Sequence, residues 1–549
     1  MGGLRAVVGT VLIAGAVLAP AACTECSTNE VRDGNRCIRT CNADADCAAE
    51  QICESGRCRD GTREPRGSAS SSGAASATAS SSSSAGGTSS SSSSASSSSA
   101  SSSSTSTGGG TSSSTSSTSS SSASNASSTT TSSAAVATSS SSSGAPDAGP
   151  EELLFVDDTA DEFNQGQLGN ATVYVVDALT LANGSTTGIY TSRVFPVAHA
   201  DARNTLAWTP AAPYGKDIPT GANVTEVGAY VEGGLDPTGL TLLLHFNRPE
   251  GTVLSDADTF SDDTGRGHVV QMVDLNPPDN SSYTAGRLQQ GVHLKREDYL
   301  RLVDSDVDDD FAFGTGEFTW AIWVRITDCA LSEDNAVAMG GEDPHVWIGA
   351  LCPTGTAHWQ VNDDTGAGVG AVGPVIVDGQ WHHLVGIKRN SPNRALLYVD
   401  GAFAATVDHD WGTFSAFTKE IFLGNFPIGS GPGYNYQSEL EVDEAAIFKR
   451  RLTVAEIRQL HQRGALRLGL QVRNCLDAAC STDATWLGPD GTDATRFGEP
   501  TPATVDAPAP VMLPTAITGP YVQYRVILES DAPGYAPRLL QTRLNLVAR

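Results

Sequence analysis

The sequence predicts an all-β fold with two β-sandwich domains, preceded by a disulfide-rich module and a disordered linker. Across residues 150–549, short apolar runs are separated by Gly, Pro, Asn and Asp, which is typical of sandwiches with little helix. The apolar run at 395–399 ends on Asp400-Gly401, a dipeptide that favours the two-residue type I′ turn of a hairpin. Another stretch is apolar at every second position, as a strand with one core-facing side requires: Phe318, Trp320, Ile322 and Val324.

The chain begins with the pattern of a secretory signal, which we assign to residues 1–22. Arg5 precedes an apolar run that is too short to span a bilayer. The following Pro-Ala-Ala-Cys23 resembles a bacterial lipobox, in which the cysteine would be acylated by diacylglycerol. The same residues also fit an ordinary small-x-small cleavage site, which would release a secreted protein.

Cysteine parity favours lipidation of Cys23. The chain has 11 cysteines, and assigning Cys23 to lipidation leaves an even number for disulfides in an oxidising compartment. We therefore expect an extracytoplasmic protein, attached by its lipid to the outer membrane or cell surface. The net charge of −28 argues against nucleic acid or bare anionic membrane as partners, because both select clustered Lys and Arg.

Residues 23–60 form the expected disulfide module. Six cysteines fall close together and resemble the EGF-like or Dickkopf-like repeats of secreted proteins: Cys26, Cys37, Cys41, Cys47, Cys53 and Cys58. Zinc is the competing interpretation, but the secretory context and the absence of His favour disulfides. Spacing does not fix their connectivity.

Ser, Thr, Ala and Gly make up nearly all of the larger part of residues 61–150. A segment of this composition cannot form a hydrophobic core. We predict a disordered linker. It would serve as a stalk for the C-terminal domains or would be a tolerated low-complexity expansion.

The segment 381–464 runs from a strand through the Asp-Gly hairpin to a helix. Thr453 and Glu456 have capping-box spacing, Leu452 and Ile457 fit a hydrophobic staple, and Gly464 is the expected helix stop. The order Trp-His-His, Tyr-Val-Asp-Gly, Val-Asp-Glu and Leu-Thr-x-x-Glu-Ile resembles the LamG-like jellyroll family, a concanavalin A-like β-sandwich. The resemblance covers residues 237–464. It implies a binding or structural module and names no ligand.

Short strands on both sides of this segment predict a second domain. Neither 151–236 nor 465–549 has enough strands to close a sandwich, so we expect the two flanks to pair into one discontinuous domain that hosts the jellyroll. Two small independent β units are the alternative.

Cysteine parity and domain membership predict two further disulfides. We expect Cys329 to pair with Cys352 inside the jellyroll and Cys475 to pair with Cys480 in the flanking domain.

The resemblance also implies a structural calcium ion, with Asp443 and Asp263 as candidate ligands. The alternatives are a buried carboxylate that accepts backbone hydrogen bonds for Asp443, and a turn residue for Asp263.

Three aromatic residues in loop-like surroundings are candidates for sugar stacking: Trp411, Tyr434 and Tyr436. Alternatively, these rings cap the sandwich core.

Several catalytic motifs are absent, including His-Glu-x-x-His and Gly-x-Ser-x-Gly. Related hydrolases alternate three carboxylates on one strand, but here Ala445 follows Glu441 and Asp443, so the acid/base is missing. His382 and His383 point to opposite faces of a strand and are interpreted as packing and hydrogen-bonding residues. We therefore expect no enzymatic activity.

The sequence thus predicts a non-catalytic surface lipoprotein that recognises an extracellular glycan or glycoprotein in adhesion or attachment. A structural envelope protein without a discrete ligand is the alternative, and a carbohydrate-active hydrolase is third.

Overall fold

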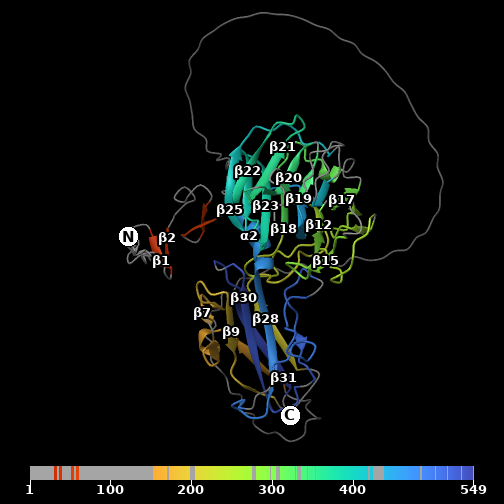
Figure 1. Cartoon of the computed structure of the whole chain (residues 1–549). Coiled ribbons are helices and arrows are strands. Elements are labelled where there is room, and N and C mark those ends of the chain that lie inside the picture. The colour runs from red at the N-terminus through yellow and green to blue at the C-terminus, as the bar shows by residue number, and fades with distance from the viewer. Residues whose placement is uncertain are drawn as a thin grey trace, which may run out of the picture. The chain divides into compact units, whose positions relative to one another are not determined.

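The computed structural model of the 549-residue chain describes two short N-terminal hairpins and most of residues 152–547 (Figure 1). Within 152–547 it leaves out residues 170–171, 198–203, 257, 275–279, 297, 304–308, 328, 330–334, 343, 353, 418–420, 425–437, 482–484, 501–502, 516 and 533. The hairpins pair β1 (Glu30–Asp33) with β2 (Arg36–Arg39) and β3 (Gln51–Glu54) with β4 (Arg57–Asp60). The expected signal peptide, Cys23 and the expected linker lie outside the described residues.

Two sheets of eight strands each form the jellyroll. The first has the order β15-β16-β27-β18-β23-β24-β25, and β12 also pairs with β27. Its strands are β12 (Leu240–Leu244), β15 (Ser282–Ala285), β16 (Gln290–Leu294), β18 (Phe318–Ile326), β23 (Trp381–Asn390), β24 (Asn393–Val399), β25 (Ala402–Asp408) and β27 (Leu440–Phe448).

The second jellyroll sheet has the order β13-β14-β17-β26-β19-β20-β21-β22. Its strands are β13 (Thr259–Ser261), β14 (Val269–Val273), β17 (Tyr299–Val303), β19 (Asn335–Gly341), β20 (Val346–Leu351), β21 (Thr356–Asn362), β22 (Gly368–Val375) and β26 (Ile421–Gly424); a 3-10 turn, η2 (Asp309–Phe311), follows β17. Inward side chains of both sheets form the main core, in which Trp320 and Trp359 are fully buried with ring centroids 5.9 Å apart.

Strands from both flanks pair to make a second sandwich. In one sheet β30 (Tyr521–Ser530) lies beside β28 (Leu466–Cys475), β9 (Thr187–Thr191) and β10 (Phe195–Pro196), and β6 (Gln167–Gly169) follows β9. In the other sheet β31 (Arg538–Val547) lies beside β5 (Glu152–Asp157), β8 (Ala178–Leu181) and β11 (Thr205–Pro210), with β7 (Thr172–Val175) and β29 (Val511–Met512) at the margins. A short helix, α1 (Ala160–Phe163), follows β5. The predicted all-β architecture of an inserted jellyroll is confirmed, since neither flank forms its sheets alone.

The helix α2 (Val454–Ala465) packs on the outer face of the first jellyroll sheet. Thr453 and Glu456 form the expected capping box, and Leu452 and Ile457 are both buried in the cluster that joins helix and sheet. The helix leads directly into β28 of the second sandwich, with Leu466 as its C-cap in extended conformation (Figure 1). No helix among the described residues is long and apolar enough to span a membrane.

The expectation that Gly464 ends the helix is wrong, because α2 continues through this glycine to Ala465. Gly464 lies inside α2, and a Cβ atom there would meet Cζ2 of Trp323 at 2.7 Å. The glycine is therefore required for close approach of the helix to the sheet and not for a left-handed C-cap.

The structure contains both disulfides that parity and domain membership predicted. Cys329 bonds Cys352, with Cα atoms 5.5 Å apart, and Cys475 bonds Cys480, with Cα atoms 4.8 Å apart. Each bond therefore closes a loop within its own domain.

Candidate functional site

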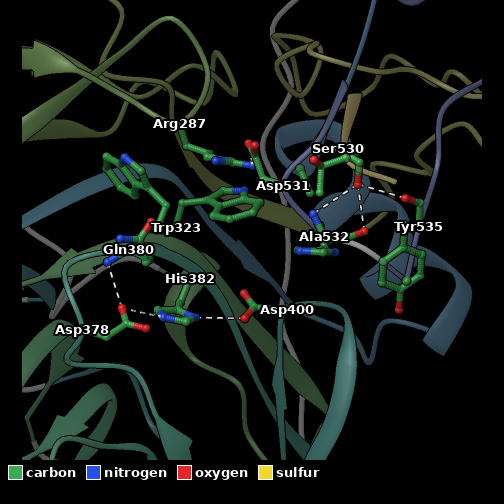
Figure 2. Close-up of a pocket in the computed structure, with 15 residues that line it drawn as sticks. Arg287, Trp323, Asp378, Gln380, His382, Asp400, Ser530, Asp531, Ala532 and Tyr535 are labelled. Carbon is green, nitrogen blue, oxygen red and sulfur yellow. Dashed lines mark hydrogen bonds and ion pairs between the residues drawn. The ribbon is translucent and has the colours of Figure 1, made fainter. Parts of the chain in front are cut away.

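A cleft of about 780 Å³ lies where the jellyroll meets the second sandwich (Figure 2). The jellyroll supplies side chains from β18, the turn between β15 and β16, the start of β23 and the turn before it, the Asp400-Gly401 hairpin and helix α2. The second sandwich supplies mainly the end of β30 and the connection from β30 to β31. The polar and aromatic residues that line the cleft are Thr186, Arg287, Trp323, Asp378, Gln380, Trp381, His382, Asp400, His461, Ser530, Asp531 and Tyr535.

Asp400 is placed in the cleft by the hairpin that the sequence predicted. Asp400 and Gly401 both have positive φ, 52° and 72°, as a type I′ turn requires. The Oδ1 atom of Asp400 accepts the backbone N–H of His383 at 2.9 Å, and Oδ2 lies 2.9 Å from Nδ1 of His382. The turn therefore holds a carboxylate against the start of β23.

His382 is bracketed by two carboxylates on the cleft wall. Its Nε2 atom lies 3.2 Å from Oδ1 of Asp378, while Nδ1 bonds Asp400 (Figure 2). Burial by itself would lower the pKa of His382, but the hydrogen bonds and charges of Asp400 and Asp378 outweigh burial and raise it. The imidazole thus stabilises two acidic groups that could accept hydrogen bonds from a ligand.

His461 and Trp323 form the apolar floor of the cleft. Their rings stack with centroids 5.5 Å apart, and Tyr535 meets His461 edge-on at 5.6 Å. Burial lowers the pKa of His461 to about 4, so this ring is neutral at physiological pH. His383, which points away from His382 as the strand geometry predicted, also has its pKa lowered, to about 3, by burial and by the nearby His461.

An ion pair crosses between the two domains at the cleft. One guanidinium nitrogen of Arg287 lies 2.7 Å from Oδ2 of Asp531, and the guanidinium sits 4.8 Å from the centre of the Trp323 ring. Arg467 bonds the same oxygen of Asp531 at 2.7 Å. The second sandwich is therefore joined by charge to the jellyroll wall.

Two residues that line the cleft each have one buried polar atom without a hydrogen-bond partner among the described residues. These atoms are Nδ1 of His461 and Nε of Arg287, both inaccessible to solvent. Because solvent does not reach either atom, neither is available to a ligand that enters the open cleft.

Of the three aromatic residues proposed from the sequence for ligand stacking, Trp411 is described by the structure and does not line this cleft. Trp411 is half-buried, packs against the jellyroll core and donates its indole N–H to the carbonyl of Val361 at 3.0 Å, as a core-capping residue would. Tyr434 and Tyr436 lie outside the described residues. A ligand-binding role for these three rings stays a prediction.

The two candidate calcium ligands have different surroundings. Asp443 is fully buried, and its Oδ2 atom accepts the backbone N–H groups of Arg287 and Leu288 at 2.7 and 2.8 Å, as the alternative of a buried carboxylate describes. Asp263 lies in a turn, and its Oδ2 atom accepts the N–H of His245 at 3.0 Å. Calcium binding by this pair stays a prediction.

The hydrolase-like carboxylates of β27 are engaged in structural contacts. Glu441 forms an ion pair with Arg325, Asp443 bonds backbone amides, and Ala445 is buried in the core. None of the three lines the cleft.

In the sequence, Trp381, His382 and Asp400 indicate only a strand and a turn. Asp531 and Tyr535, which lie beside them in the cleft, come from the other domain. These residues come together only because of how the two sandwiches pack, and local sequence patterns do not indicate that packing.

The paired eight-stranded sheets define the inserted domain as a concanavalin A-like jellyroll. Residues 295–458 match the family model of the concanavalin A-like lectin/glucanases superfamily, Laminin_G_3, and this part of the chain is therefore a domain of that kind. No curated protein sequence matches the chain.

Several solved structures are similar to part of the chain at low identity. They include the binding domain of Paraclostridial Mosquitocidal Protein 1 (13% identity, 44% of this chain and 61% of that one, TM-score 0.31) and the binding domain of botulinum neurotoxin serotype G (12%, 44% and 57%, 0.31). A third is domain 4 of AbnA, an extracellular arabinanase from Geobacillus stearothermophilus, in complex with arabinotriose (20%, 41% and 98%, 0.30). The chain thus spans about 60% of the two toxin domains, and similarities this low carry no argument about function.

Proposed function

We propose that this protein is a non-catalytic surface lipoprotein that binds an extracellular glycan or glycoprotein in the cleft between its two sandwiches. The proposal rests on one observation: aromatic and polar side chains line this cleft, and one of its walls belongs to a domain of the lectin/glucanase superfamily. Trp381 and Tyr535 are partly exposed rings on which a sugar face could stack, and Asp378 and Gln380 are exposed polar groups beside them.

The chemistry of the lining suits a neutral or cationic saccharide better than a strongly anionic one. Three carboxylates face the cleft, from Asp378, Asp400 and Asp531, against one guanidinium from Arg287. Each carboxylate is an acceptor for ligand hydroxyl groups.

A glycan array screened with the mature chain, carrying Cys23→Ser to keep it free of lipid, tests this function. We expect saturable binding to a defined saccharide, weakened about tenfold or more by Trp381→Ala and by Tyr535→Ala, a loss of about 1.4 kcal/mol each. Phe403→Ala is the matched control, because Phe403 is an aromatic residue 51% exposed on β25 that does not line the cleft.

Other outcomes discriminate between the remaining functions. Binding that survives both cleft substitutions would move the site elsewhere, with Trp411, Tyr434 and Tyr436 next in order. No binding to any glycan would favour a structural envelope role, and release of shortened saccharides from the array ligand would indicate a hydrolase.

Surface attachment has its own test. In cells expressing the full chain, we expect a radiolabelled fatty acid to be incorporated and the protein to fractionate with membranes, both lost in Cys23→Ala. A soluble secreted protein in both cases would remove the lipid from the proposal.

A further inference from the structure

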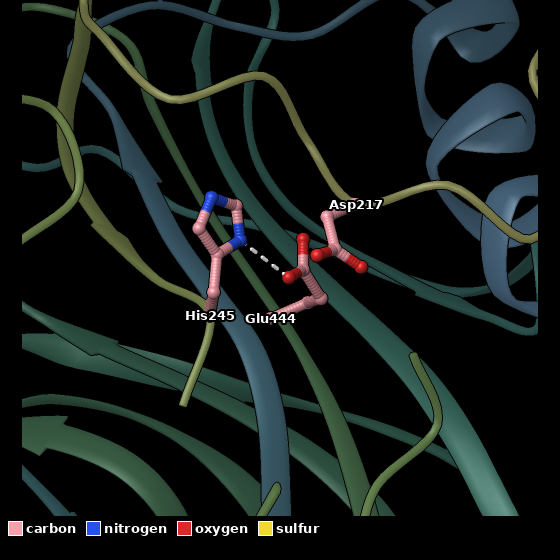
Figure 3. Close-up of side chains that lie close together, drawn as sticks. All are labelled: Asp217, His245 and Glu444. Atoms are coloured by element: carbon pink, nitrogen blue, oxygen red, sulfur yellow. Dashed lines mark hydrogen bonds and ion pairs between the residues drawn. The ribbon is translucent and has the colours of Figure 1, made fainter. Parts of the chain in front are cut away.

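A second constellation of side chains includes Glu444, the neighbour of Asp443 in strand β27. Asp217, His245 and Glu444 are all buried, and each offers one ligand atom within 4.8 Å of the others' (Figure 3). Asp217 belongs to the segment that leads into the jellyroll, His245 follows β12, and Glu444 lies in β27. The closest pair is Nδ1 of His245 and Oε1 of Glu444, at 2.5 Å.

A β-bulge turns Glu444 toward this cluster. The register between β18 and β27 shifts so that Glu444 and Ala445 together oppose a single residue, Ile322, and Glu444 has a φ of 47°. Bulges re-aim side chains in this way and are frequent next to functional sites. Asp443 consequently bonds the amides of Arg287 and Leu288, while its neighbour faces His245.

A shell of hydrogen bonds orients the three side chains. Ile218 donates its backbone N–H to Oε2 of Glu444 at 3.1 Å, and the amides of Asn247 and Gln289 both donate to Oδ2 of Asp217. Among the described residues, no hydrogen bond reaches Oδ1 of Asp217, so this oxygen is available to an ion. The outer ring nitrogen of His245 lies 3.5 Å from Oγ1 of Thr220.

The cluster also borders a cavity of about 510 Å³. Asp217 and His245 line it, together with Asp263, Asn247 and Arg248. An ion and its water ligands could therefore reach the cluster from outside, which a sealed core cluster would not permit.

We propose that Asp217, His245 and Glu444 bind one divalent transition-metal ion of the zinc class. One imidazole nitrogen and two carboxylates form a mixed nitrogen and oxygen donor set, which suits zinc, whereas calcium selects oxygen ligands alone. Ligand atoms about 2.0 Å from a tetrahedral ion are roughly 3.3 Å apart, so His245 and Glu444 need to separate by less than about 1 Å. Water from the cavity would complete the coordination.

The ion would tie the segment before the jellyroll to the jellyroll itself. Asp217 is followed by Ile218, which packs in the same cluster as helix α2. Metal binding would therefore stabilise the folded state and hold the two sandwiches' connecting segment in place.

Zinc titration of the full mature chain with oxidised disulfides tests the site. We expect one zinc ion per chain by calorimetry and by metal analysis after gel filtration, together with a raised Tm. His245→Gln should lower the zinc affinity at least tenfold and abolish the Tm shift, and Asp217→Asn should weaken binding in the same direction.

His293→Gln is the matched control. His293 also pairs with a glutamate, Glu439, at 2.7 Å, but on the exposed side of β16 and without a third ligand. This variant should bind zinc as the wild type does.

Three results would overturn the proposal: no zinc bound by the wild-type chain, zinc binding unchanged in both cluster variants, or calcium binding in preference to zinc. The first and third results are measured on the wild-type chain, so they would contradict the proposal even if His245→Gln failed to fold. The first would leave a metal-free ion pair between His245 and Glu444.

Discussion

The guanidinium of Arg463 and the carboxylate of Glu226 form an ion pair in which both side chains are buried, 237 positions apart in the sequence. Arg463 belongs to helix α2, and Glu226 lies in the segment that leads into the jellyroll. Lys216 contacts the other oxygen of Glu226 at 3.1 Å and bonds the hydroxyl of Tyr230, which donates to Glu499 at 2.8 Å. A buried chain of polar groups thus joins the jellyroll helix to the second sandwich.

We predict that Glu226→Gln destabilises the protein by about 3–5 kcal/mol. The substitution leaves Arg463 and Lys216 buried without their shared counter-charge, and removing one partner of a buried ion pair has a cost of this order. Chemical denaturation measures the change. Glu232→Gln, which removes a half-exposed partner of Arg538, should change the free energy of unfolding by less than about 1 kcal/mol. Equal effects of the two substitutions would contradict the proposed role of burial.

Acid should destabilise the fold through His461 at a pH above the ordinary pKa of aspartate and glutamate. Burial lowers the pKa of this ring to about 4, against roughly 6.5 in the unfolded chain. The unfolded state therefore binds the proton first, and stability is complete above about pH 6.5 and declines as pH falls toward 4, by about 3 kcal/mol in total.

The phenylalanine variant isolates that contribution. His461→Phe keeps an aromatic ring against Trp323 and removes the titrating group, while Asp400, Arg287, His382 and His383 remain. Between pH 6.5 and 5, the stability of this variant should fall less steeply than that of the wild type. Parallel curves would mean that His461 is protonated as easily in the folded state as in the unfolded one.

Gly386→Ala should destabilise the jellyroll by about 2 kcal/mol or more. A Cβ atom at this position in β23 would lie 2.2 Å from Cδ2 of the fully buried Trp359, and overpacked cores lose stability on this scale. Gly498→Ala is the matched control, because the nearest atom to its Cβ is a backbone oxygen at 3.7 Å. Thermal unfolding of both variants compares them, and a shift of similar size would show that the sheets can move apart at Trp359.

The two disulfides should differ in their contribution according to loop length. Replacing Cys329 and Cys352 by alanine opens a separation of 23 residues, for which the chain-entropy relation gives about 3 kcal/mol; replacing Cys475 and Cys480 opens one of 5, for which it gives about 2 kcal/mol. Denaturant midpoints of the two double variants measure the order. A larger loss of stability for the shorter loop would mean that the Cys475–Cys480 disulfide stabilises the protein mainly through packing, since both cysteines are buried.

Local patterns predicted the elements of the jellyroll well, because each depends on residues close in sequence. The Asp400-Gly401 turn, the alternation of Phe318 to Val324 and the Thr453 to Glu456 capping box are such features, and all three occur in the structure. Strand counting in the flanks also predicted their pairing, since unpaired sheet edges would otherwise remain.

The candidate sites were predicted less well, because they depend on contacts between distant segments. The sequence motif favours Asp443 as a ligand, but its carboxylate bonds backbone amides. The β-bulge instead directs the adjacent Glu444 to His245. A one-residue shift of register exchanges the faces of a strand, and the sequence of β27 alone does not indicate where that shift occurs.

The pairing of β5 with β31 has a mechanical consequence. The two strands are antiparallel, with Glu152 opposite Val547 and Asp157 opposite Thr542, and the connection into β31 borders the cleft through Asp531 and Tyr535. A ligand held in the cleft and an anchor on the chain before Glu152 would pull these strands lengthwise past each other. Tension applied in this shearing direction loads all the hydrogen bonds between the two strands at once, instead of opening them one after another. The fold should therefore resist unfolding when force acts between a ligand in the cleft and the proposed anchor.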